Sequence, residues 1–338
     1  DIRMQVPDGV YAGRGQNEVV KVLVGQHLWP ELGARLEFLL GYPHGCVEQT
    51  TSSTLPLLAA RDILPRIGLT SMPKKELDKR IKSGIDRLAS MRTSGGGLAY
   101  WPGGSSPNVF GTAYAIRAVI AAKKANIELP PGLLEGMTSY LEEQMLKSRT
   151  AAEVKAAIAQ SLAEVDELSQ SSADALYDTM EGQGAFGLAS LAIALSHLEG
   201  QDDRVKTILD AVESKFDSNG NLVDNSKNDD FYYYGSKTRT KAQALTALGR
   251  LRKASTLRPT LTKVLAETTG RYTTQSTAYS LMAVAEQIVD SPPDGAKVDV
   301  FFTVVIIFKL ITLPAFIVLG VPGVLIGLVF WVSVKEPP

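Results

Sequence analysis

A helical pattern that recurs from about residue 28 to residue 289 is the feature that most constrains the fold of this chain. Within this stretch apolar residues recur at i, i+3, i+4 and i+7, which is the spacing of one face of an α-helix. Loops rich in Gly, Pro, Ser and Asn separate the helical segments. The segments with this pattern are 77–91, 112–122, 134–146, 152–162, 186–198, 205–216, 242–251 and 277–288. The pattern predicts a mainly α fold.

A weak internal repeat runs through the same stretch. The sequence TAYAIRAV at 112–119 resembles TAYSLMAV at 277–284, and the segments 187–195 and 240–248 share the same Ala-rich rhythm. Small residues let helices approach closely, and helix pairs that cannot bury their faces alone stack on their neighbours. Similar amphipathic helices in one bundle would give the same pattern. We expect instead a closed ring of helix pairs, an α/α toroid, over 27–290.

The two ends of the chain have a different character. Residues 1–26 contain two short β-like stretches around a Gly-rich turn, and we interpret them as a β-rich remnant of an adjacent domain. We expect the chain to be a processed piece of a longer protein. After a linker at 291–299, residues 310–334 carry no charge, and 300–308 are also apolar. This run exceeds the roughly 20 residues that a helix needs to cross a membrane. We therefore predict a transmembrane-like helix within 300–334, the alternative being a buried core helix or strands.

Charge and metal-ligand content exclude some classes of function. The net charge is −1, which gives no electrostatic indication of nucleic-acid binding. The chain has 3 His and 1 Cys, too few for a clustered Cys/His zinc site. We therefore expect no metal, no cofactor and no nucleic-acid partner.

The single cysteine, Cys46, lies in the stretch GYPHGCVEQTTSS at 41–53. A glycine precedes it and polar residues follow it, which is typical of a helix N-terminus, where unpaired backbone N–H groups favour a thiolate. Gln49 lies three residues on, so both side chains share one face of a helical turn, with Cβ atoms roughly 5–6 Å apart. A thiolate held there can attack the amide and form an internal thioester with loss of ammonia. An inert buried thiol is the alternative interpretation.

The sequence around Cys46 resembles the thioester motif of the alpha-2-macroglobulin and complement superfamily, in its bacterial form. The similarity extends upstream over 28–40 and downstream through GGLAYWPGG to about residue 290. The matching positions are Tyr42, Pro43, Gly45, Cys46, Glu48, Gln49, Thr50, Thr51, Ser52, Leu55 and Pro56.

The resemblance implies a thioester α/α toroid domain at 27–290 and covalent trapping of proteases through Cys46 and Gln49. The chain would then be a single-turnover trap and not an enzyme, with proteases or surface amines as targets. Members that favour hydroxyl targets use a histidine, and the corresponding region, 173–187, has none, so we expect amine targets. Bacterial members are similar to periplasmic, membrane-anchored defence proteins. The macroglobulin and bait domains are absent from these residues, and the apolar tail departs from the family pattern.

Several other residues are candidates for supporting roles. We expect Glu48 to cap or to hydrogen-bond near the helix start. Four aromatic side chains are candidates for a lid that keeps water from the thioester, although aromatic residues at the edge of a toroid core would give the same pattern. These four are Tyr100, Trp101, Tyr232 and Tyr234. His44 could act as a base, but a histidine in such a turn is more often solvated.

A function from another class fits part of the sequence. The apolar run at 300–334 is also compatible with a structural or scaffolding subunit of a membrane protein complex. In that case the toroid would serve as a binding surface for other subunits, and Cys46 and Gln49 would remain unreacted. Replacement of Cys46 by alanine separates the two hypotheses, because it would abolish trapping and leave complex assembly intact.

Overall fold

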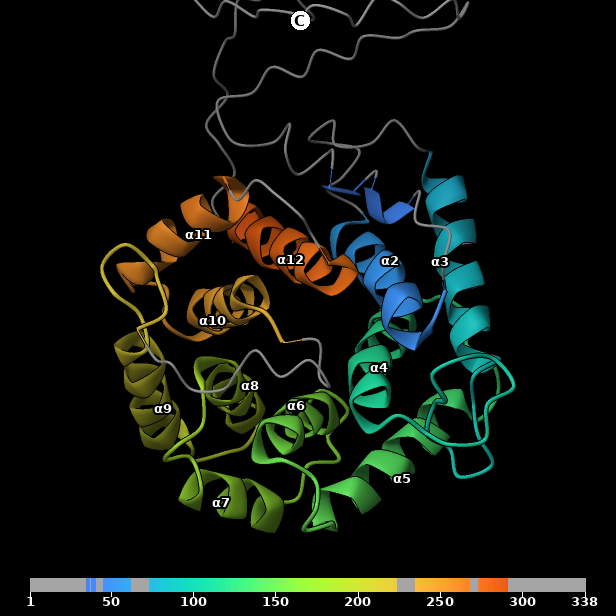
Figure 1. Cartoon of the computed structure of the whole chain (residues 1–338), viewed down its shortest axis with the longest axis horizontal. Helices are drawn as coiled ribbons and strands as arrows, with labels where there is room; N and C mark the ends of the chain where they lie inside the picture. Colours follow the sequence, from blue (N-terminus) through green and yellow to red (C-terminus); the bar gives the residue numbers. More distant parts are fainter. Residues whose placement is uncertain are drawn as a thin grey trace, which may run out of the picture. The chain divides into compact units, whose positions relative to one another are not determined.

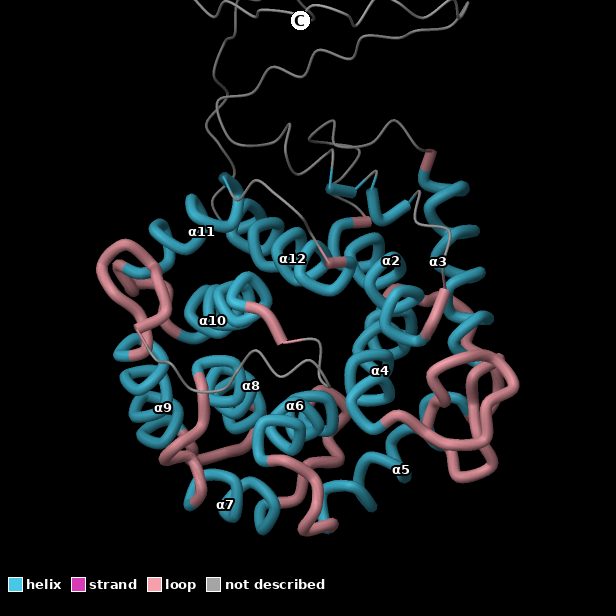
Figure 2. Tube along the Cα trace, in the orientation of Figure 1, coloured by secondary structure: helices cyan, strands magenta, loops and turns pink. Residues whose placement is uncertain are grey.

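The computed structural model describes residues 35–36, 38–40, 45–61, 73–223, 235–267 and 273–290. Within these ranges the regular secondary structure is helical, and β pairing is limited to isolated bridges such as Arg92 with Leu98. Figure 2 shows the helices joined by loops. The helices are α2 (Val47–Ala60), α3 (Lys74–Ala89), α4 (Val109–Lys124), α5 (Leu133–Leu146), α6 (Ala152–Ala163), α7 (Gln170–Asp178), α8 (Ala185–Leu195), α9 (Asp202–Ser214), α10 (Lys237–Leu251), α11 (Leu257–Glu267) and α12 (Thr274–Asp290). The prediction of a mainly α fold is confirmed for this part of the chain.

These helices form a ring of two concentric layers (Figure 1). The even-numbered helices make the inner layer: each contacts the next one along the ring, and α12 contacts α2, so that the circle closes. The odd-numbered helices lie outside, each against the two inner helices that flank it in the sequence. This arrangement is the closed ring of helix pairs that the repeat pattern predicts.

The sequence of each helix explains its layer. Helix α8, AFGLASLAIAL, is apolar or small at every position, and every one of its residues is buried. A helix that is apolar all round must be enclosed by other elements. Helix α3 is rich in Lys, Asp and Arg, and its buried side chains form a single stripe, at Leu77, Ile81, Ile85 and Leu88. The four segments with the repeated small-residue pattern all fall in inner helices, α4, α8, α10 and α12, because inner helices need small side chains for close packing on several sides.

The loop between α3 and α4 contains a glycine that the backbone requires. Gly96 has φ +85°, in the left-handed region, and a Cβ there would lie 2.2 Å from the carbonyl oxygen of Gly136 in α5. Gly95, the preceding residue, has open space where its Cβ would be. The loop therefore approaches the backbone of α5 closely at Gly96 and not at Gly95.

We expect Gly96→Ala to lower the free energy of unfolding by about 2 kcal/mol or more. The left-handed conformation alone costs about 1–2 kcal/mol for an L-residue, and the contact with a backbone oxygen adds to that cost. Gly95→Ala is the matched control and should change stability by less than about 0.5 kcal/mol. Urea unfolding of both variants is the measurement, and equal stabilities would contradict the assigned role of Gly96.

Three segments singled out in the sequence lie outside the described residues: the β-like region 1–26, the linker 291–299 and the apolar run 300–334. Among the helices of the described ranges, none combines the length and the apolarity needed to cross a bilayer.

Candidate functional site

The first turn of α2 brings Cys46 and Gln49 together. Cys46 is the N-cap residue, with extended backbone angles of φ −69° and ψ 172°, and Gln49 occupies position N3. The side-chain carbonyl oxygen Oε1 of Gln49 accepts a hydrogen bond from the backbone N–H of Cys46 at 3.2 Å, as in a capping box. Cys46 is 1% exposed, and Gln49 is partly buried. The amide of Gln49 is thus folded back over the residue that carries the thiol.

The backbone around Cys46 is hydrogen-bonded to neighbouring segments, and its side chain is buried. The N–H of Val47 donates to the carbonyl oxygen of Tyr100 at 3.0 Å, which docks the loop between α3 and α4 on the start of α2. The N–H of Thr50 donates to the carbonyl of Cys46 at 2.9 Å and begins the helical ladder. Cys46 therefore lies at the N-terminus of α2, which is the positive end of the helix dipole.

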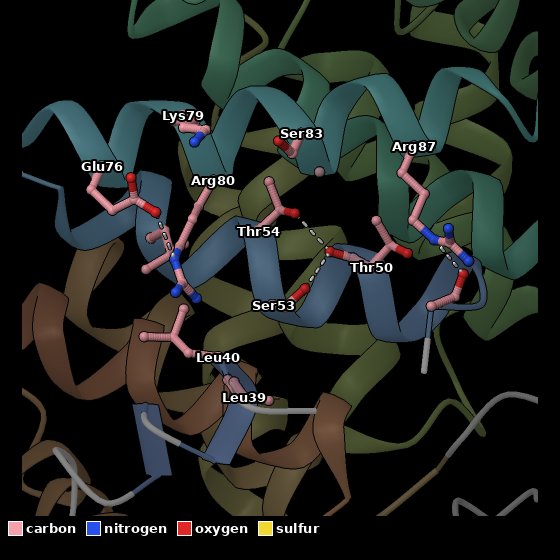
Figure 3. Close-up of a pocket in the computed structure, with 13 residues that line it drawn as sticks. Leu39, Leu40, Thr50, Ser53, Thr54, Glu76, Lys79, Arg80, Ser83 and Arg87 are labelled. Atoms are coloured by element: carbon pink, nitrogen blue, oxygen red, sulfur yellow. Dashed lines mark hydrogen bonds and ion pairs between the residues drawn. The ribbon is translucent and has the colours of Figure 1, made fainter. Parts of the chain in front are cut away.

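Gly45 fixes the path of the chain into this turn. Its carbonyl oxygen accepts a hydrogen bond from Nε of Arg87 in α3 at 2.9 Å (Figure 3). A Cβ at position 45 would lie 2.3 Å from the same Nε atom. The absence of a side chain at position 45 leaves room for this approach of the guanidinium, and Gly45 is tied to α3 through the hydrogen bond.

Glu48 is buried and makes hydrogen bonds both within the first turns of α2 and across to α12. Its carboxylate is 5% exposed, and it accepts hydrogen bonds from the hydroxyl of Ser52 at 2.6 Å and from the hydroxyl of Thr274 at 2.9 Å to each oxygen. Burial raises the pKa of Glu48, and the two hydrogen bonds partly oppose that rise. The side chain is therefore bonded to Ser52 near the start of its own helix and also joins α2 to α12.

The hydrogen-bond network continues from Glu48 to the centre of the ring. Ser52 donates its one hydroxyl proton to Glu48, so in the 3.1 Å contact between Ser52 and Tyr114 the tyrosine is the donor. The ring of Tyr114 in α4 stacks on that of Tyr279 in α12, with 5.4 Å between centroids. Tyr279 in turn accepts a hydrogen bond from Arg117 at 3.1 Å. These hydrogen bonds and the ring stack therefore connect the start of α2 with buried side chains of α4 and α12.

Arg239 connects the first turns of four other inner helices. Its guanidinium is fully buried, donates to Glu153 of α6 at 2.9 Å, and lies over the rings of Phe186 in α8 at 4.0 Å and Phe110 in α4 at 5.4 Å. It also lies 3.4 Å from Gln275 of α12. Together with the Glu48–Thr274 contact, these distances place the N-termini of all six inner helices, α2 to α12, at the end of the ring that carries Cys46.

Arg239, Glu153 and Thr274 were not singled out from the sequence. The sequence SKTRTKAQALTAL contains three cations, and nothing in it separates Arg239 from Lys237 and Lys241. Nothing local marks Thr274, because its partner lies 226 residues away in the chain.

The candidate aromatic lid is only partly within the described residues. Tyr100 and Trp101 pack edge to face, with 5.6 Å between ring centroids, and are 38% and 49% exposed. Their loop contacts α2 through the backbone carbonyl of Tyr100, and both residues are partly exposed. Tyr232, Tyr234, Tyr42, Pro43 and His44 lie outside the described residues. Among the residues that are described, no group of three or more His, Cys, Asp or Glu side chains could hold a metal ion.

A groove of about 520 Å³ runs between α2 and α3, next to Gly45. Figure 3 shows Thr50, Ser53 and Thr54 of α2 facing the charged side chains of α3. Those charged residues are Glu76, Lys79, Arg80 and Arg87. Both hydroxyls of Ser53 and Thr54 donate to the carbonyl of Thr50, at 3.0 and 2.8 Å, so they are satisfied within α2. The groove lies on the opposite side of α2 from the buried carboxylate of Glu48.

Comparison with known proteins gives a consistent set of relatives. The chain is 28% identical over 190 residues to an alpha-2-macroglobulin of Xylella fastidiosa, and 27% identical over 115 residues to that of Escherichia coli. The structure resembles that of native alpha-2-macroglobulin from Escherichia coli spanning domain MG7 to the C-terminus, with a TM-score of 0.66, 20% identity and coverage of 77% of this chain and 42% of the other. The sequence and fold comparisons support the alpha-2-macroglobulin family.

A further alpha-2-macroglobulin structure has the same fold in this region. It is the Salmonella alpha-2-macroglobulin reacted with methylamine, with a TM-score of 0.64, 23% identity and coverage of 76% of this chain and 17% of the other. No family model matches the chain. The Xylella match covers 52% of this chain and 12% of its relative, and the Escherichia coli match covers 32% and 7%. The chain therefore corresponds to a small part of its alpha-2-macroglobulin relatives.

Proposed function

We propose that this chain forms an internal thioester between Cys46 and Gln49 and acts as the covalent-attachment part of an alpha-2-macroglobulin-like protease trap. The observation that carries the proposal is the fold-back of the Gln49 amide over the buried Cys46, with Oε1 of Gln49 3.2 Å from the backbone nitrogen of Cys46. The named relatives add support, since structures of the Escherichia coli alpha-2-macroglobulin are of forms activated by porcine elastase and by trypsin.

Formation of the bond uses groups that are already adjacent. The Sγ atom of Cys46 attacks the side-chain carbonyl carbon Cδ of Gln49, the Cδ–Nε2 bond breaks, and the thiol proton leaves with the nitrogen as ammonia. The negative charge that develops on Oε1 is stabilised by the backbone N–H of Cys46, which already donates to that oxygen. The positive end of the α2 dipole favours the attacking thiolate.

Attachment then transfers the acyl group to a target. A target amine attacks Cδ of Gln49, the Sγ–Cδ bond breaks, and a proton from the amine neutralises the departing Cys46 thiolate. The products are an amide between Gln49 and the target and a free thiol. Water gives Glu at position 49 instead, so the bond must be kept dry until it is needed. Each chain reacts once, and the protein is therefore a protease inhibitor of the trapping kind and not a turnover catalyst.

The remaining sequence predictions become parts of the same proposal. Residues 27–290 would be the thioester domain, 1–26 the end of an adjacent β-rich domain, and 300–334 a membrane anchor in a periplasmic or extracytoplasmic setting. The anchor and the location rest on the sequence of 300–334 alone. The alternative of a scaffolding subunit is not favoured, because the relatives that the comparisons name are alpha-2-macroglobulins.

The intact mass of the native protein, before and after methylamine, tests the proposal. We expect a mass one ammonia below the encoded value, addition of one methylamine, and a thiol that becomes titratable only after that addition. A protein with the encoded mass, an unreacted Gln49 and a thiol titratable from the start would contradict the thioester. A mass corresponding to Glu at position 49 would identify a thioester that formed and was then hydrolysed.

A further inference from the structure

We infer that Thr274 is a positioning residue for the Cys46–Gln49 turn, acting through its hydrogen bond to Glu48. The inference rests on the proposed function, since it concerns the formation of the same thioester. Helix α12, the last inner helix in the sequence, would therefore contribute to the chemistry at the start of α2, the first inner helix.

The contact lies where the ring closes. Helices α2 and α12 are neighbours in the inner layer, although α2 is the first and α12 the last of the inner helices in the sequence. Glu48 and Thr274 are 226 residues apart. No covalent connection of short length holds these two helices together. Arg35 makes a second polar contact across the closure, donating to the carbonyls of Leu265 and Ala266 at the end of α11 at 2.7 and 3.2 Å. Of these two contacts, the Thr274–Glu48 bond involves the first turn of α2.

The geometry leaves the Glu48 carboxylate one favourable position. Its two oxygens are 2.9 Å from the Thr274 hydroxyl, and Oε1 is also 2.6 Å from the Ser52 hydroxyl. Glu48 and Thr274 are 5% and 7% exposed. A buried carboxylate is costly unless it is hydrogen-bonded, so its side chain stays where those hydroxyls lie. Glu48 stands between Cys46 and Gln49 in one turn, and fixing its side chain therefore fixes the rotation of that turn relative to α12.

Loss of the Thr274 hydroxyl would release this constraint. Glu48 would retain Ser52, which belongs to the same helix and cannot hold α2 against α12. The carboxylate would then gain by turning toward water, and the first turn of α2 would move with it. Attack by Sγ on Cδ needs a separation near 3–3.5 Å, and a displacement of about 1 Å can lower a rate about 10²-fold.

The experiment measures the thioester fraction of Thr274→Val in the full chain, from the intact mass and from the thiol released by methylamine. Val has the shape of Thr without the hydroxyl, and we expect a fraction lower than that of the unsubstituted protein by about tenfold or more. Thr274→Ser keeps the hydroxyl and should restore the fraction. Thr277→Val is the matched control: Thr277 is 1% exposed in the same helix, and its hydroxyl donates only to the carbonyl of Thr273 within that segment, at 2.8 Å.

The outcomes separate positioning from folding. Loss of the thioester in Thr274→Val, with Thr277→Val unaffected at a similar melting temperature, supports the inference. Equal fractions in Thr274→Val and the unsubstituted protein, or equal losses in both valine variants, would overturn it and leave the proposed function standing. Absence of the thioester from the unsubstituted protein would overturn both. Thr274→Ala removes the same hydroxyl with less bulk and replaces the valine variant if that variant does not fold.

Discussion

Replacement of Cys46 by alanine is expected to abolish the covalent attachment of methylamine and of target amines completely. The chain has one cysteine, so no other thiol can form the thioester or leave from it. The fold should remain, because Cys46 is a small side chain at a helix N-cap and its removal leaves the α2 ladder intact. Intact mass after methylamine treatment measures the effect, and circular dichroism verifies the helical content.

Two further variants make this result specific. Gln49→Glu has the composition of the hydrolysed bond and should also take up no methylamine, although its thiol is present. Ser53→Ala, one turn along α2, removes a hydroxyl that donates only to the carbonyl of Thr50, and should attach methylamine as the unsubstituted protein does. Uptake of methylamine by Cys46→Ala would assign the attachment to another group and would rule out the thioester.

Replacement of Arg239 by methionine is expected to lower the free energy of unfolding by about 3 kcal/mol. Removing one partner of a buried ion pair costs about 3–5 kcal/mol, because the other charge is left uncompensated. The lower end applies here, since the side chain of Glu153 is 23% exposed and can gain some water. The variant also loses the stacking of the guanidinium on Phe110 and Phe186.

Arg250→Met is the matched control for this prediction. Arg250 lies in the same helix, α10, and pairs with Glu286, but the two side chains are 38% and 32% exposed. Such exposed pairs contribute about 0–1 kcal/mol. Urea unfolding of both variants compares a central with a peripheral arginine. Equal losses of stability would show that Arg239 does not hold the first turns of the inner helices together.

The two variants also distinguish the parts of the ring. Cys46→Ala removes chemistry and leaves packing, whereas Arg239→Met removes packing at the end of the ring where Cys46 lies. If the proposed thioester depends on that end being closed, Arg239→Met will also lower the thioester fraction, in proportion to the population that opens.

Local sequence predicted most of the helices, although none of the segments named from the pattern covers α7 or α11, and it predicted that Cys46 and Gln49 share one helical turn. Helix periodicity is a property of neighbouring residues, and a spacing of three residues places two side chains on one face whatever surrounds them. The structure shows that the Ala-rich segments lie in inner helices, where small side chains permit close packing on several sides. The boundaries differ by a few residues: the pattern at 112–122 belongs to a helix that begins at Val109, where Asn108 caps it by accepting a hydrogen bond from the N–H of Gly111.

Contacts between distant segments were beyond the sequence. Glu48 was expected to cap or hydrogen-bond near its own helix start, and it does bond to Ser52 there, but its second bond, to Thr274, was not foreseen. The Arg239 guanidinium likewise meets side chains from α4, α6, α8 and α12. Tyr100 and Trp101 were candidates for a lid; the backbone carbonyl of Tyr100 contacts α2 and both residues are partly exposed, so shielding of the thioester stays a prediction.

The sequence by itself predicted the mainly α fold and most of the helical segments, and it placed Cys46 and Gln49 on one face of a helical turn. The tertiary structure alone decided that the ring closes between α2 and α12 and that six helix N-termini meet at the end that carries Cys46. The physical reason is that helix formation and the reach of a side chain within one turn depend on residues a few positions apart. Closure of the ring depends instead on hydrogen bonds and packing between residues such as Glu48 and Thr274, whose proximity exists only after every intervening helix has folded.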